Sequence, residues 1–410
     1  MGLDGKPERP GFAAVMDQAF RLGGKALIEK GHPYFVPVDR IEAMYSSKPG
    51  GFVNLAHYDY LGLGKHPAVR GSAVDAINTF GPGAGASRLV GGERLAHKAL
   101  ERNLAEFLGV GDVLTMISGY LTNLSLINHL MFPRDLVLID SLAHNSIVIG
   151  AHSGRFECQT FEHNNLDDLE AKLAAVRNNY RNVLIVVEGL YSMDGDIPDL
   201  GRLVEIKNRH QSWLLVDEAH SYGVLGPTGR GACEHFGIPT SEIELSVGTL
   251  SKAFVSSGGF VCASENVINM LRFSLPGFVY SVGLAPATVA SANAALDVLK
   301  AEPDRVARVK AKSRLFLEAA QAAGLNTGNA IGEAVVPLLF DNPLQTMMVS
   351  QVLMDHGIYA PPIVQIGVPK DQPRIRFFFS ADHRDEDILR AVDIAAAAVE
   401  GRVQMQMASS

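Results

Sequence analysis

The stretch Gly248–Gly259 contains a lysine whose surroundings favour nucleophilic chemistry. Lys252 stands among small and hydroxyl-bearing residues (GTLSKAFVSSGG) and follows an apolar run that predicts a buried strand. A desolvated lysine amine loses its proton more easily and then attacks carbonyl carbons. Thr249 and Ser251 add hydroxyl groups beside it, and the final glycines allow the backbone to approach a ligand closely. A solvated lysine in a surface loop would show the same local pattern, so this stretch leaves both interpretations open.

A second group of polar residues stands where the predicted strand Val113–Ile117 gives way to a helix. Ser118, Gly119 and Tyr120 begin that helix, and the backbone N–H groups at a helix start suit a phosphate group. The ring of Tyr120 could stack on an aromatic ligand. Turns of this kind are also common without any ligand, so this stretch does not establish a phosphate site by itself.

Histidines and carboxylates follow three further predicted strands. His144 comes shortly after the first, and Glu188 and Ser192 follow the second. Asp217 and His220 follow the third, in DEAHSYGVLG. A carboxylate at a strand end could hold a protonated ring nitrogen, because a buried carboxylate needs a partner. The same residue types also occur there as helix caps and structural histidines, so each alone is compatible with a purely structural role.

Strands and helices alternate along the middle of the chain, which predicts a mostly parallel sheet. The predicted strands are 113–117, 136–139, 156–161, 183–187, 213–216, 243–247 and 259–263. Continuous β-branched runs such as LIVV are typical of strands buried on both faces. Right-handed crossovers place the carboxyl ends of parallel strands along one edge, where ligands bind. That edge would then bring together an amine, a carboxylate, a helix start that can bind phosphate, and a histidine that can stack on a ring. A pyridoxal phosphate enzyme requires this set of groups.

Three segments are predicted from the changes in pattern along the chain. Residues 1–60 form an N-terminal arm that is partly helical, and residues 61–300 form the large domain with the sheet. A helical pattern at 287–299 leads into residues 301–410. That segment begins with a second helical pattern at 305–323 and is predicted to form a smaller α+β domain. At 410 residues the chain is long enough for more than one packed core.

Composition excludes several classes of function. Apolar residues make up 47% and charged residues 20%, which is ordinary for a globular protein, and the net charge of -8 argues against nucleic-acid or membrane-surface binding. The three cysteines are scattered, so neither a metal site nor a disulfide framework is predicted, and a reducing cytoplasm is expected. No apolar run is long enough to predict stable membrane insertion.

In combination, several stretches resemble one enzyme family. VDEAHSYGVLGPTGRG followed by GTLSKAFVSSGG is similar to the α-oxoamine synthases of the fold-type I pyridoxal phosphate superfamily. The motifs DYLGL (59–63), GASRLVGG (85–92), SGYLTN (118–123), EGLYSMDGD (188–196) and RFFFSADH (376–383) stand in the family's order. The resemblance implies an α/β fold: a large domain with a mostly parallel seven-stranded sheet, and a smaller C-terminal α+β domain. It also implies pyridoxal 5′-phosphate as the cofactor.

The resemblance implies a role for each matching residue. Lys252 would form the Schiff base and remove the α-proton, and Asp217 would pair with the pyridine nitrogen. His144 would stack on the cofactor ring and bind the substrate, and His220 would contact the phenolic oxygen. Further cofactor contacts are implied for Ser118, Gly119, Tyr120, Asn123, Glu188, Ser192, Thr249 and Ser251, with Ser281 reaching the cofactor of a neighbouring subunit. Substrate contacts are implied for Tyr58, Ser87, His144 and Arg376, whose planar guanidinium suits a carboxylate.

The implied reaction joins a small amino acid to an acyl thioester, on coenzyme A or an acyl-carrier protein, with loss of carbon dioxide and thiol. Ser87 stands where aminolevulinate-forming members tend to have threonine, which favours serine or alanine over glycine. Tyr58 before Asp59 resembles the serine palmitoyltransferases, and Ile363 after a proline pair replaces a threonine of the oxononanoate synthases. Both positions weaken an assignment to the biotin pathway, so a serine palmitoyltransferase-like enzyme is favoured. The alternatives are an 8-amino-7-oxononanoate synthase, which uses alanine and a pimeloyl thioester, and an aminotransferase of the same fold. The resemblance also implies a homodimer with shared active sites.

Overall fold

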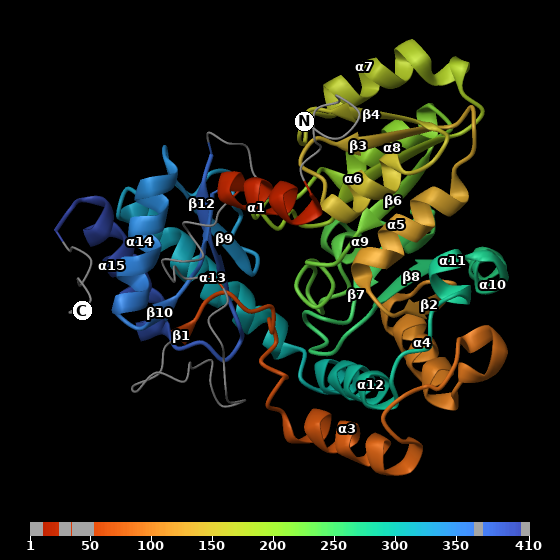
Figure 1. The fold of residues 1–410 in the computed structure, drawn as a ribbon, viewed down its shortest axis with the longest axis horizontal. Helices are drawn as coiled ribbons and strands as arrows, with labels where there is room; N and C mark the ends of the chain where they lie inside the picture. The colour runs from red at the N-terminus through yellow and green to blue at the C-terminus, as the bar shows by residue number, and fades with distance from the viewer. Residues whose placement is uncertain (1–10, 24–33, 35–52, 365–371, 403–410) are drawn as a thin grey trace, which may run out of the picture.

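The computed structural model describes residues 11–23, 34, 53–364 and 372–402. Its largest element is a seven-stranded sheet in the order β2-β8-β7-β6-β5-β3-β4 (Figure 1). The strands are β2 Asp112–Met116, β3 Leu136–Asp140, β4 Glu157–Phe161, β5 Val183–Glu188, β6 Trp213–Asp217, β7 Leu245–Thr249 and β8 Gly259–Ala263. The predicted α/β class and mostly parallel sheet are confirmed. Only β8 runs against its neighbours in this sheet, since it pairs antiparallel with both β2 and β7.

The centre of the sheet is buried on both faces because its strands there are apolar on both faces. All six residues of β5 (VLIVVE) are buried, as are the five of β3. One face packs against α4 Leu95–Leu108, α7 Leu166–Val176, α8 Leu200–Arg209 and α12 Pro286–Ala301. The other face packs against α5 Gly119–Leu130, α6 Asn145–His152, α10 Glu265–Ser274 and α11 Pro276–Val279. Strands buried on both faces appear in the sequence as continuous β-branched runs, so their positions could be predicted from the sequence.

Several helices that follow strands of this sheet begin with a polar capping residue. Ser118 caps α5, and His144 caps α6 by accepting a hydrogen bond from Ser146 N. Asn165 and Asp199 cap α7 and α8 in the same way. Because capping side chains satisfy the first N–H groups of a helix, these residues determine where each helix begins.

The C-terminal part of the chain forms a second, smaller layer. Strands β9 Val335–Leu339, β11 Pro362–Ile363 and β12 Arg374–Phe378 make an antiparallel sheet. Helices α13 Asp304–Ala322, α14 Pro343–Asp355 and α15 Asp385–Val399 pack with it in the same apolar core. This arrangement agrees with the smaller α+β domain that the sequence predicts, and we propose 61–300 and 301–410 as domain limits.

Part of the predicted N-terminal arm packs on this smaller layer. β1 Val53–Asn54 pairs in parallel with β10 Ile358–Tyr359 (Figure 1). Most of the arm 1–60 lies outside the described residues, apart from α1 Phe12–Gly23 and the end that contains β1. The turn after β1 then leads to α3 Pro67–Phe80, which packs along α12.

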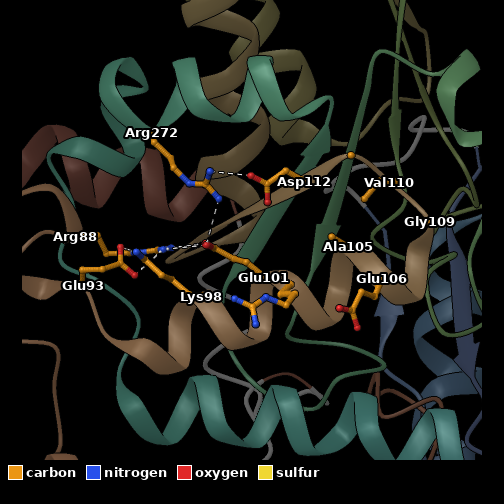
Figure 2. Close-up of a pocket in the computed structure, with 12 residues that line it drawn as sticks. Arg88, Glu93, Lys98, Glu101, Ala105, Glu106, Gly109, Val110, Asp112 and Arg272 are labelled. Atoms are coloured by element: carbon orange, nitrogen blue, oxygen red, sulfur yellow. Dashed lines mark hydrogen bonds and ion pairs between the residues drawn. The ribbon is translucent and has the colours of Figure 1, made fainter.

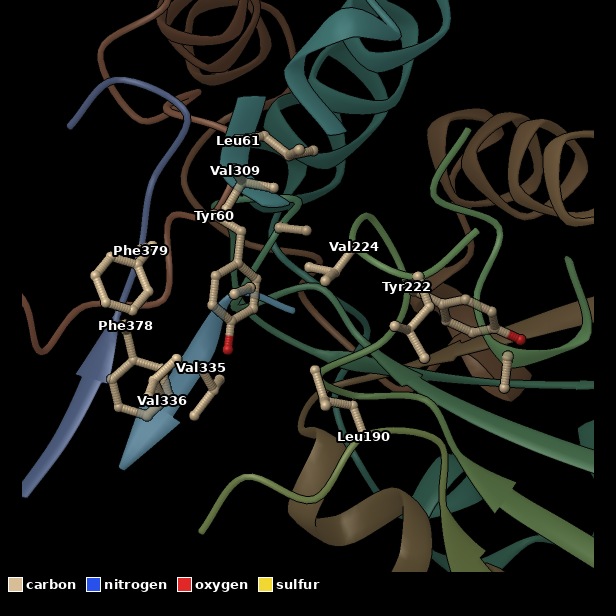
Figure 3. Packing of buried hydrophobic residues seen from close by; sticks show 14 of the residues in the cluster. Tyr60, Leu61, Leu190, Tyr222, Val224, Val309, Val335, Val336, Phe378 and Phe379 are labelled. Carbon is tan, nitrogen blue, oxygen red and sulfur yellow. The ribbon is translucent and has the colours of Figure 1, made fainter. Parts of the chain in front are cut away.

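Tyr60 joins the two parts of the core. Figure 3 shows it between Phe378 of the small sheet and Leu190 of the large domain. Its side chain is fully buried, so its phenol oxygen needs a partner, and it finds one in His220. The packing thus connects the small sheet directly to a predicted site residue.

Among the described helices, none is long and apolar enough to cross a membrane. Three helices were not anticipated from the sequence: α9 Ala232–Phe236, α10 and α11. α9 and α11 have five and four residues, too few for a helical repeat of apolar positions to become visible.

Candidate active site

A cavity of about 340 Å³ opens at the edge of the sheet where the parallel strands end. The predicted site residues that line it are Tyr58, Ser118, Gly119, Tyr120, Asn123, His144, Glu188, Ser192, Asp217, His220, Thr249, Ser251, Lys252 and Arg376. These residues come from the turn after β1, from the ends of β2, β3, β5, β6 and β7, and from the small sheet. The fold therefore brings together, in one cavity, the side chains that were predicted to meet at the ends of the parallel strands.

Lys252 lies in the short loop between β7 and β8, with its amine in the cavity. Desolvation lowers the pKa of the amine to about 8, against the opposing effect of the Asp217 and Glu188 carboxylates. Nζ lies 5.8 Å from the centroid of the Tyr58 ring, within range of a cation–π contact. No hydrogen-bond partner for Nζ is found among the described residues. The amine is therefore both available to a ligand and partly unprotonated near neutral pH.

The loop that carries Lys252 is closed by backbone hydrogen bonds. Leu250 N–H donates to Gly258 O at 2.9 Å, and Ser256 N–H donates back to Leu250 O at 2.8 Å. Val255 N–H donates to the Lys252 carbonyl at 2.9 Å, and Val255 itself has φ of 45°. A β-branched residue rarely adopts this left-handed conformation, so the loop holds it at a cost.

Asp217 is held in place at the end of β6. Its Oδ2 accepts a 2.6 Å hydrogen bond from Asn123 Nδ2, and its Oδ1 accepts one of 2.9 Å from Ala219 N. Asn123 also donates to Ser146 Oγ at 3.0 Å, while its own Oδ1 is buried with no hydrogen-bond partner. A buried amide oxygen without a partner, beside a fixed carboxylate, indicates that this wall of the cavity is built to receive a polar ligand.

His144 reaches the cavity from the start of α6. Its backbone N–H donates to Glu188 Oε1 at 2.7 Å, and its Nδ1 lies 2.7 Å from Ser146 Oγ. Burial, and then the Asp217 charge, raise the pKa of Glu188 well above its usual value. The imidazole itself is exposed, edge-on to the ring of Tyr120 with centroids 6.3 Å apart. A flat ligand could therefore pack against the free face of this imidazole.

His220 is buried and held from two sides. Tyr60 Oη lies 2.6 Å from His220 Nδ1, and the Phe378 ring stacks nearby at 6.3 Å between centroids. Burial, with the charges of Lys252 and Arg376, lowers the pKa of His220 well below its usual value. A neutral imidazole with Nδ1 engaged by Tyr60 leaves the other ring nitrogen for a ligand.

Small residues bring backbone to the cavity where α5 begins. A Cβ on Gly259 would lie 2.6 Å from Gly119 Cα, and one on Gly119 would lie 3.1 Å from Thr249 Oγ1. Thr249 Oγ1 donates to Gly258 O at 3.0 Å and lies 2.8 Å from Ser251 Oγ. The start of this 12-residue helix and two hydroxyl groups therefore face the cavity together, as anion binding requires.

Arg376 enters the cavity from β12 of the small sheet. Its Nη1 donates to Ser192 O at 3.1 Å, and its guanidinium lies 4.9 Å from the centroid of the Phe378 ring. Its Nε is buried with no hydrogen-bond partner. The guanidinium is thus fixed in orientation but retains donors for an anionic group.

Two predicted site residues, Ser87 and Ser281, do not reach this cavity. Ser87 forms an isolated antiparallel bridge with Val282, and Gly283 N–H donates to Ala86 O at 3.0 Å. Ser281 lies in the same place, after α11. Close by, Tyr280 and Val90 are 86% and 85% exposed. A direct role for Ser87 in this chain's own cavity is therefore not supported.

Some residues at the site were not predicted from the sequence. Ser146 contacts both Asn123 and His144, Tyr60 contacts His220, and Met193 and Ala219 line the cavity. Tyr60 carried a signal, because it belongs to the DYLGL turn and follows Tyr58 by two positions. Ser146 carried none, since a serine in the first turn of a helix is common.

A larger cavity lies elsewhere in the described part of the chain. It has a volume of about 750 Å³ between α4, the start of β2 and α10 (Figure 2). Several of its lining charges pair with one another: Arg88 with Glu93 and Glu101, and Arg272 with Asp112. None of the predicted site residues lines it, so size alone does not identify the reactive site.

The residues of the smaller cavity fit pyridoxal phosphate. Lys252 would supply an amine of lowered pKa for the aldehyde, and Asp217 would supply a carboxylate for the pyridine nitrogen. The helix start at Gly119 suits the phosphate, and the free Oδ1 of Asn123 is an unmet acceptor in the same wall. In the described part of the chain, no cluster of side chains suited to hold a metal ion is found.

Comparison with known proteins gives consistent relatives. The sequence profile of the family "Aminotransferase class I and II" matches residues 51–394. The 8-amino-7-oxononanoate synthase of Beijerinckia indica subsp. indica is 40% identical over 338 residues, 82% of this chain and 86% of that protein. A serine palmitoyltransferase variant from S. paucimobilis with a bound PLP–myriocin aldimine has a TM-score of 0.90 at 27% identity, covering 96% of this chain and 99% of that one. An 8-amino-7-oxononanoate synthase from Francisella tularensis shares the fold, with a TM-score of 0.74 at 24% identity and coverage of 86% and 98%.

Proposed function

We propose that this chain, which belongs to the family described as aminotransferase class I and II and within it to the pyridoxal phosphate-dependent α-oxoamine synthases, condenses L-alanine with an acyl thioester as an 8-amino-7-oxononanoate synthase does. The product is an α-amino ketone, released with carbon dioxide and free thiol. The reaction class follows from the family. The choice of alanine and of a pimeloyl-type acyl group is our proposal.

One observation supports the assignment of roles most strongly. Lys252 places an amine with a pKa of about 8 in the same cavity as Asp217 and Arg376. This chemistry needs three groups around one amino acid: a base that is active near neutral pH, a carboxylate and a guanidinium. An aminotransferase of the same fold would also use them, but the relatives named above are an 8-amino-7-oxononanoate synthase and a serine palmitoyltransferase.

Pyridoxal phosphate, when bound, supplies a ring that withdraws electrons from the amino acid Cα. Lys252 then takes the Cα proton onto Nζ, which its low pKa permits. Asp217 holds a proton at the pyridine nitrogen and is itself oriented by Asn123 and by Ala219 N. The neutral ring of His220 offers a hydrogen bond from the nitrogen that Tyr60 leaves free.

Arg376 orients the amino acid before the new bond forms. Its guanidinium binds the substrate carboxylate, and its contact with Ser192 O fixes the plane of that pair. His144 covers the reacting group from the open side of the cavity. The Cα electron pair attacks the acyl carbon, and the thiolate leaves and takes a proton from solvent. Loss of carbon dioxide puts an electron pair back on Cα, which takes back the proton that Lys252 holds.

The identity of the substrates rests on the curated relatives. Tyr58 and Ile363 favoured a serine palmitoyltransferase-like enzyme over an oxononanoate synthase. The 40% identity to an 8-amino-7-oxononanoate synthase over most of both chains supports the alternative better. Two positions carry less weight than a match over 82% of the chain, so alanine becomes the preferred amino acid. The acyl group is carried by coenzyme A or by an acyl-carrier protein.

A serine palmitoyltransferase-like activity is the second candidate. It is favoured by the TM-score of 0.90 to the S. paucimobilis enzyme over nearly the whole of both chains. The cavity also has Tyr58 at its mouth, 36% exposed and edge-on to Phe378 at 4.8 Å. Serine and a long acyl thioester are therefore the substrates to test beside alanine.

We also propose that the enzyme acts as a homodimer, with Ser281 of one subunit contributing to the phosphate site of the other. Its position away from this chain's own cavity, beside exposed apolar side chains, supports that arrangement. The expected cytoplasmic location stays a prediction.

The test is a spectroscopic titration followed by an assay of thiol release. Purified protein with pyridoxal phosphate should show a visible band that changes with L-alanine and less with L-serine or glycine, and pimeloyl thioester should then release thiol. Lys252→Ala should remove turnover while the protein still binds the cofactor noncovalently. Lys65→Ala, which changes an exposed lysine outside the cavity, is the control. A response to serine with a long acyl thioester alone would replace the first candidate with the second, and full turnover by Lys252→Ala would refute both.

A further inference from the structure

His163 lies outside the cavity but connects two segments that form it. It follows β4, and its side chain is only 17% exposed. Nδ1 lies 2.9 Å from Asp140 Oδ1, and Nε2 lies 2.9 Å from Asp196 Oδ2. The edge of the Tyr191 ring packs on the imidazole at 4.5 Å between centroids. Both ring nitrogens are thus directed at buried carboxylates.

This geometry requires a proton on each ring nitrogen. A carboxylate accepts hydrogen bonds and a neutral imidazole has only one N–H, so a neutral ring could bond only one of the two. Burial by itself would lower the pKa of His163, but the hydrogen bonds and charges of Asp140 and Asp196 raise it to about 10. Asn164 Nδ2, which donates to Asp196 at 2.9 Å, also lies beside the ring. The imidazolium therefore persists at neutral pH.

Asp140 controls the segment that delivers His144. Its Oδ1 accepts from Leu142 N at 2.8 Å, and its backbone carbonyl accepts from Ala143 N at 3.0 Å. Its Oδ2 accepts from Asn164 N at 2.9 Å. The turn from β3 to α6 is therefore built on the carboxylate that His163 holds.

Asp196 controls the segment that delivers Ser192. Its carbonyl accepts from Tyr191 N at 2.9 Å, and Gly195 N donates to Tyr191 O at 2.8 Å. These bonds close the turn 191–196, which presents Ser192 and Met193 to the cavity. The same segment is held on its other side by Arg374, which donates to Met193 O at 2.9 Å and to Asp194 Oδ1 at 2.6 Å.

We propose that His163, as an imidazolium between Asp140 and Asp196, is a positioning residue that fixes His144 and Ser192 relative to each other for cofactor binding. It touches neither cofactor nor substrate and acts through the two turns. The inference rests on the proposed roles of His144 and Ser192, and it deepens the proposed function by adding a residue behind the cavity wall.

The test compares the affinity of apoprotein for pyridoxal phosphate by equilibrium dialysis. In His163→Gln, the carboxamide can donate to only one carboxylate and turns its oxygen toward the other. We expect the dissociation constant to rise on the order of tenfold, since a hydrogen bond to a buried charge is lost. The circular dichroism band of the bound cofactor should also change, because the face that His144 presents is displaced. Loss of stability with an unchanged dissociation constant and band would overturn the proposal.

Two further variants separate positioning from general damage. His152→Gln changes an exposed histidine at the end of α6 whose Nδ1 contacts the Val148 carbonyl, and it should bind the cofactor as the unchanged protein does. In the double variant His163→Gln/Asp196→Asn, the new amide group at position 196 can donate to the oxygen of the carboxamide at position 163, which restores a bond to each segment. Recovery of most of the affinity would support the proposal, and no recovery would contradict it.

A measurement on the unchanged apoprotein does not depend on any variant that fails to fold. Nitrogen NMR of protein with ¹⁵N-labelled histidine should show His163 protonated on both nitrogens up to about pH 9, with the signal assigned by its shift in Asp196→Asn. A neutral ring at pH 7 would overturn the proposal. Failure of the unchanged protein to bind pyridoxal phosphate would instead refute the proposed function, and the NMR result would still decide the state of His163.

Discussion

Lys252 combines two properties at the residue scale: a position inside the cavity and a pKa of about 8. Desolvation disfavours the charged amine, and the carboxylates of Asp217 and Glu188 prevent the pKa from falling further. The amine is then mostly protonated at pH 7 but exchanges readily. The neighbouring acids thus determine how much free base the enzyme has.

This pKa predicts the pH dependence of cofactor capture. Only the neutral amine attacks the aldehyde, so the rate at which apoprotein binds pyridoxal phosphate covalently should rise with pH and level off above about 8. Below that value the rate should fall by about tenfold per pH unit. Stopped-flow absorbance across the range measures it. A midpoint near 10.5, the ordinary lysine value, would show that desolvation does not act on this amine.

At the scale of elements, the close approach of α5 and β8 is the feature most sensitive to change. Gly259→Ala would place a methyl group 2.6 Å from Gly119 Cα, so the helix start and the strand must separate. We expect a loss of about 1–3 kcal/mol in the free energy of unfolding and weaker cofactor binding, since overpacking displaces the phosphate cradle. Urea unfolding and dialysis measure the two effects.

Gly71→Ala is the matched control for that variant. Gly71 lies within α3, and a methyl group added there would meet no neighbouring atom within 4 Å. Alanine should therefore raise helix stability by about 0.5–1 kcal/mol and leave cofactor binding unchanged. A loss of cofactor affinity in both variants would show that the effect of Gly259→Ala is not specific to the cradle.

The backbone of Val255 gives a second prediction at this scale. Its φ of 45° is costly for any residue with a Cβ, and glycine avoids that cost. Val255→Gly and Val255→Ala lose the same packing apart from one methyl group, but only the first relieves the backbone. We expect Val255→Gly to be more stable than Val255→Ala by about 1 kcal/mol, measured by urea unfolding. Equal stability, or a more stable alanine variant, would contradict the strained conformation.

The sequence predicted the elements of the large sheet well because its central strands, such as β3 (LVLID) and β5 (VLIVVE), are nearly continuous apolar runs. β7 begins two residues later than predicted, since Ile243 follows a short 3-10 turn and lies outside the ladder. The reversed direction of β8 was not predictable, because a buried run has the same composition in either direction. At the site, chemically reactive residues were found from their types, whereas Tyr60 and Ser146 depend on contacts made across the fold.

At the scale of the whole molecule, Ser281 and Ser87, which lie outside the cavity, suggest how two subunits would form shared active sites. Ser281 and Ser87 lie together, beside the exposed Tyr280 and Val90. An apolar surface of this kind, next to residues predicted for the site, is what a shared active site would need. The prediction is that each subunit completes the site of its neighbour.

Mixed dimers test that sharing. Lys252→Ala and Ser281→Asp should each be inactive alone, the second because a carboxylate repels the phosphate. After denaturation and joint refolding, about a quarter of the activity per subunit should return, since half the dimers are mixed and each has one intact site. Thiol release measures it. If the mixture stays as inactive as its components, Ser281 serves its own chain's site or none.

Strand pairing between distant parts of the sequence has a consequence for synthesis on the ribosome. β2 has no partner in the large sheet except β8, and β1 pairs with β10 close to the end of the chain. Both early strands emerge long before their partners exist: the backbone edge of β2 stays open until β8 is made at residue 259, and that of β1 until β10 is made at residue 358. The nascent chain is therefore most exposed to aggregation before its C-terminal part appears, and slower synthesis would lengthen that period.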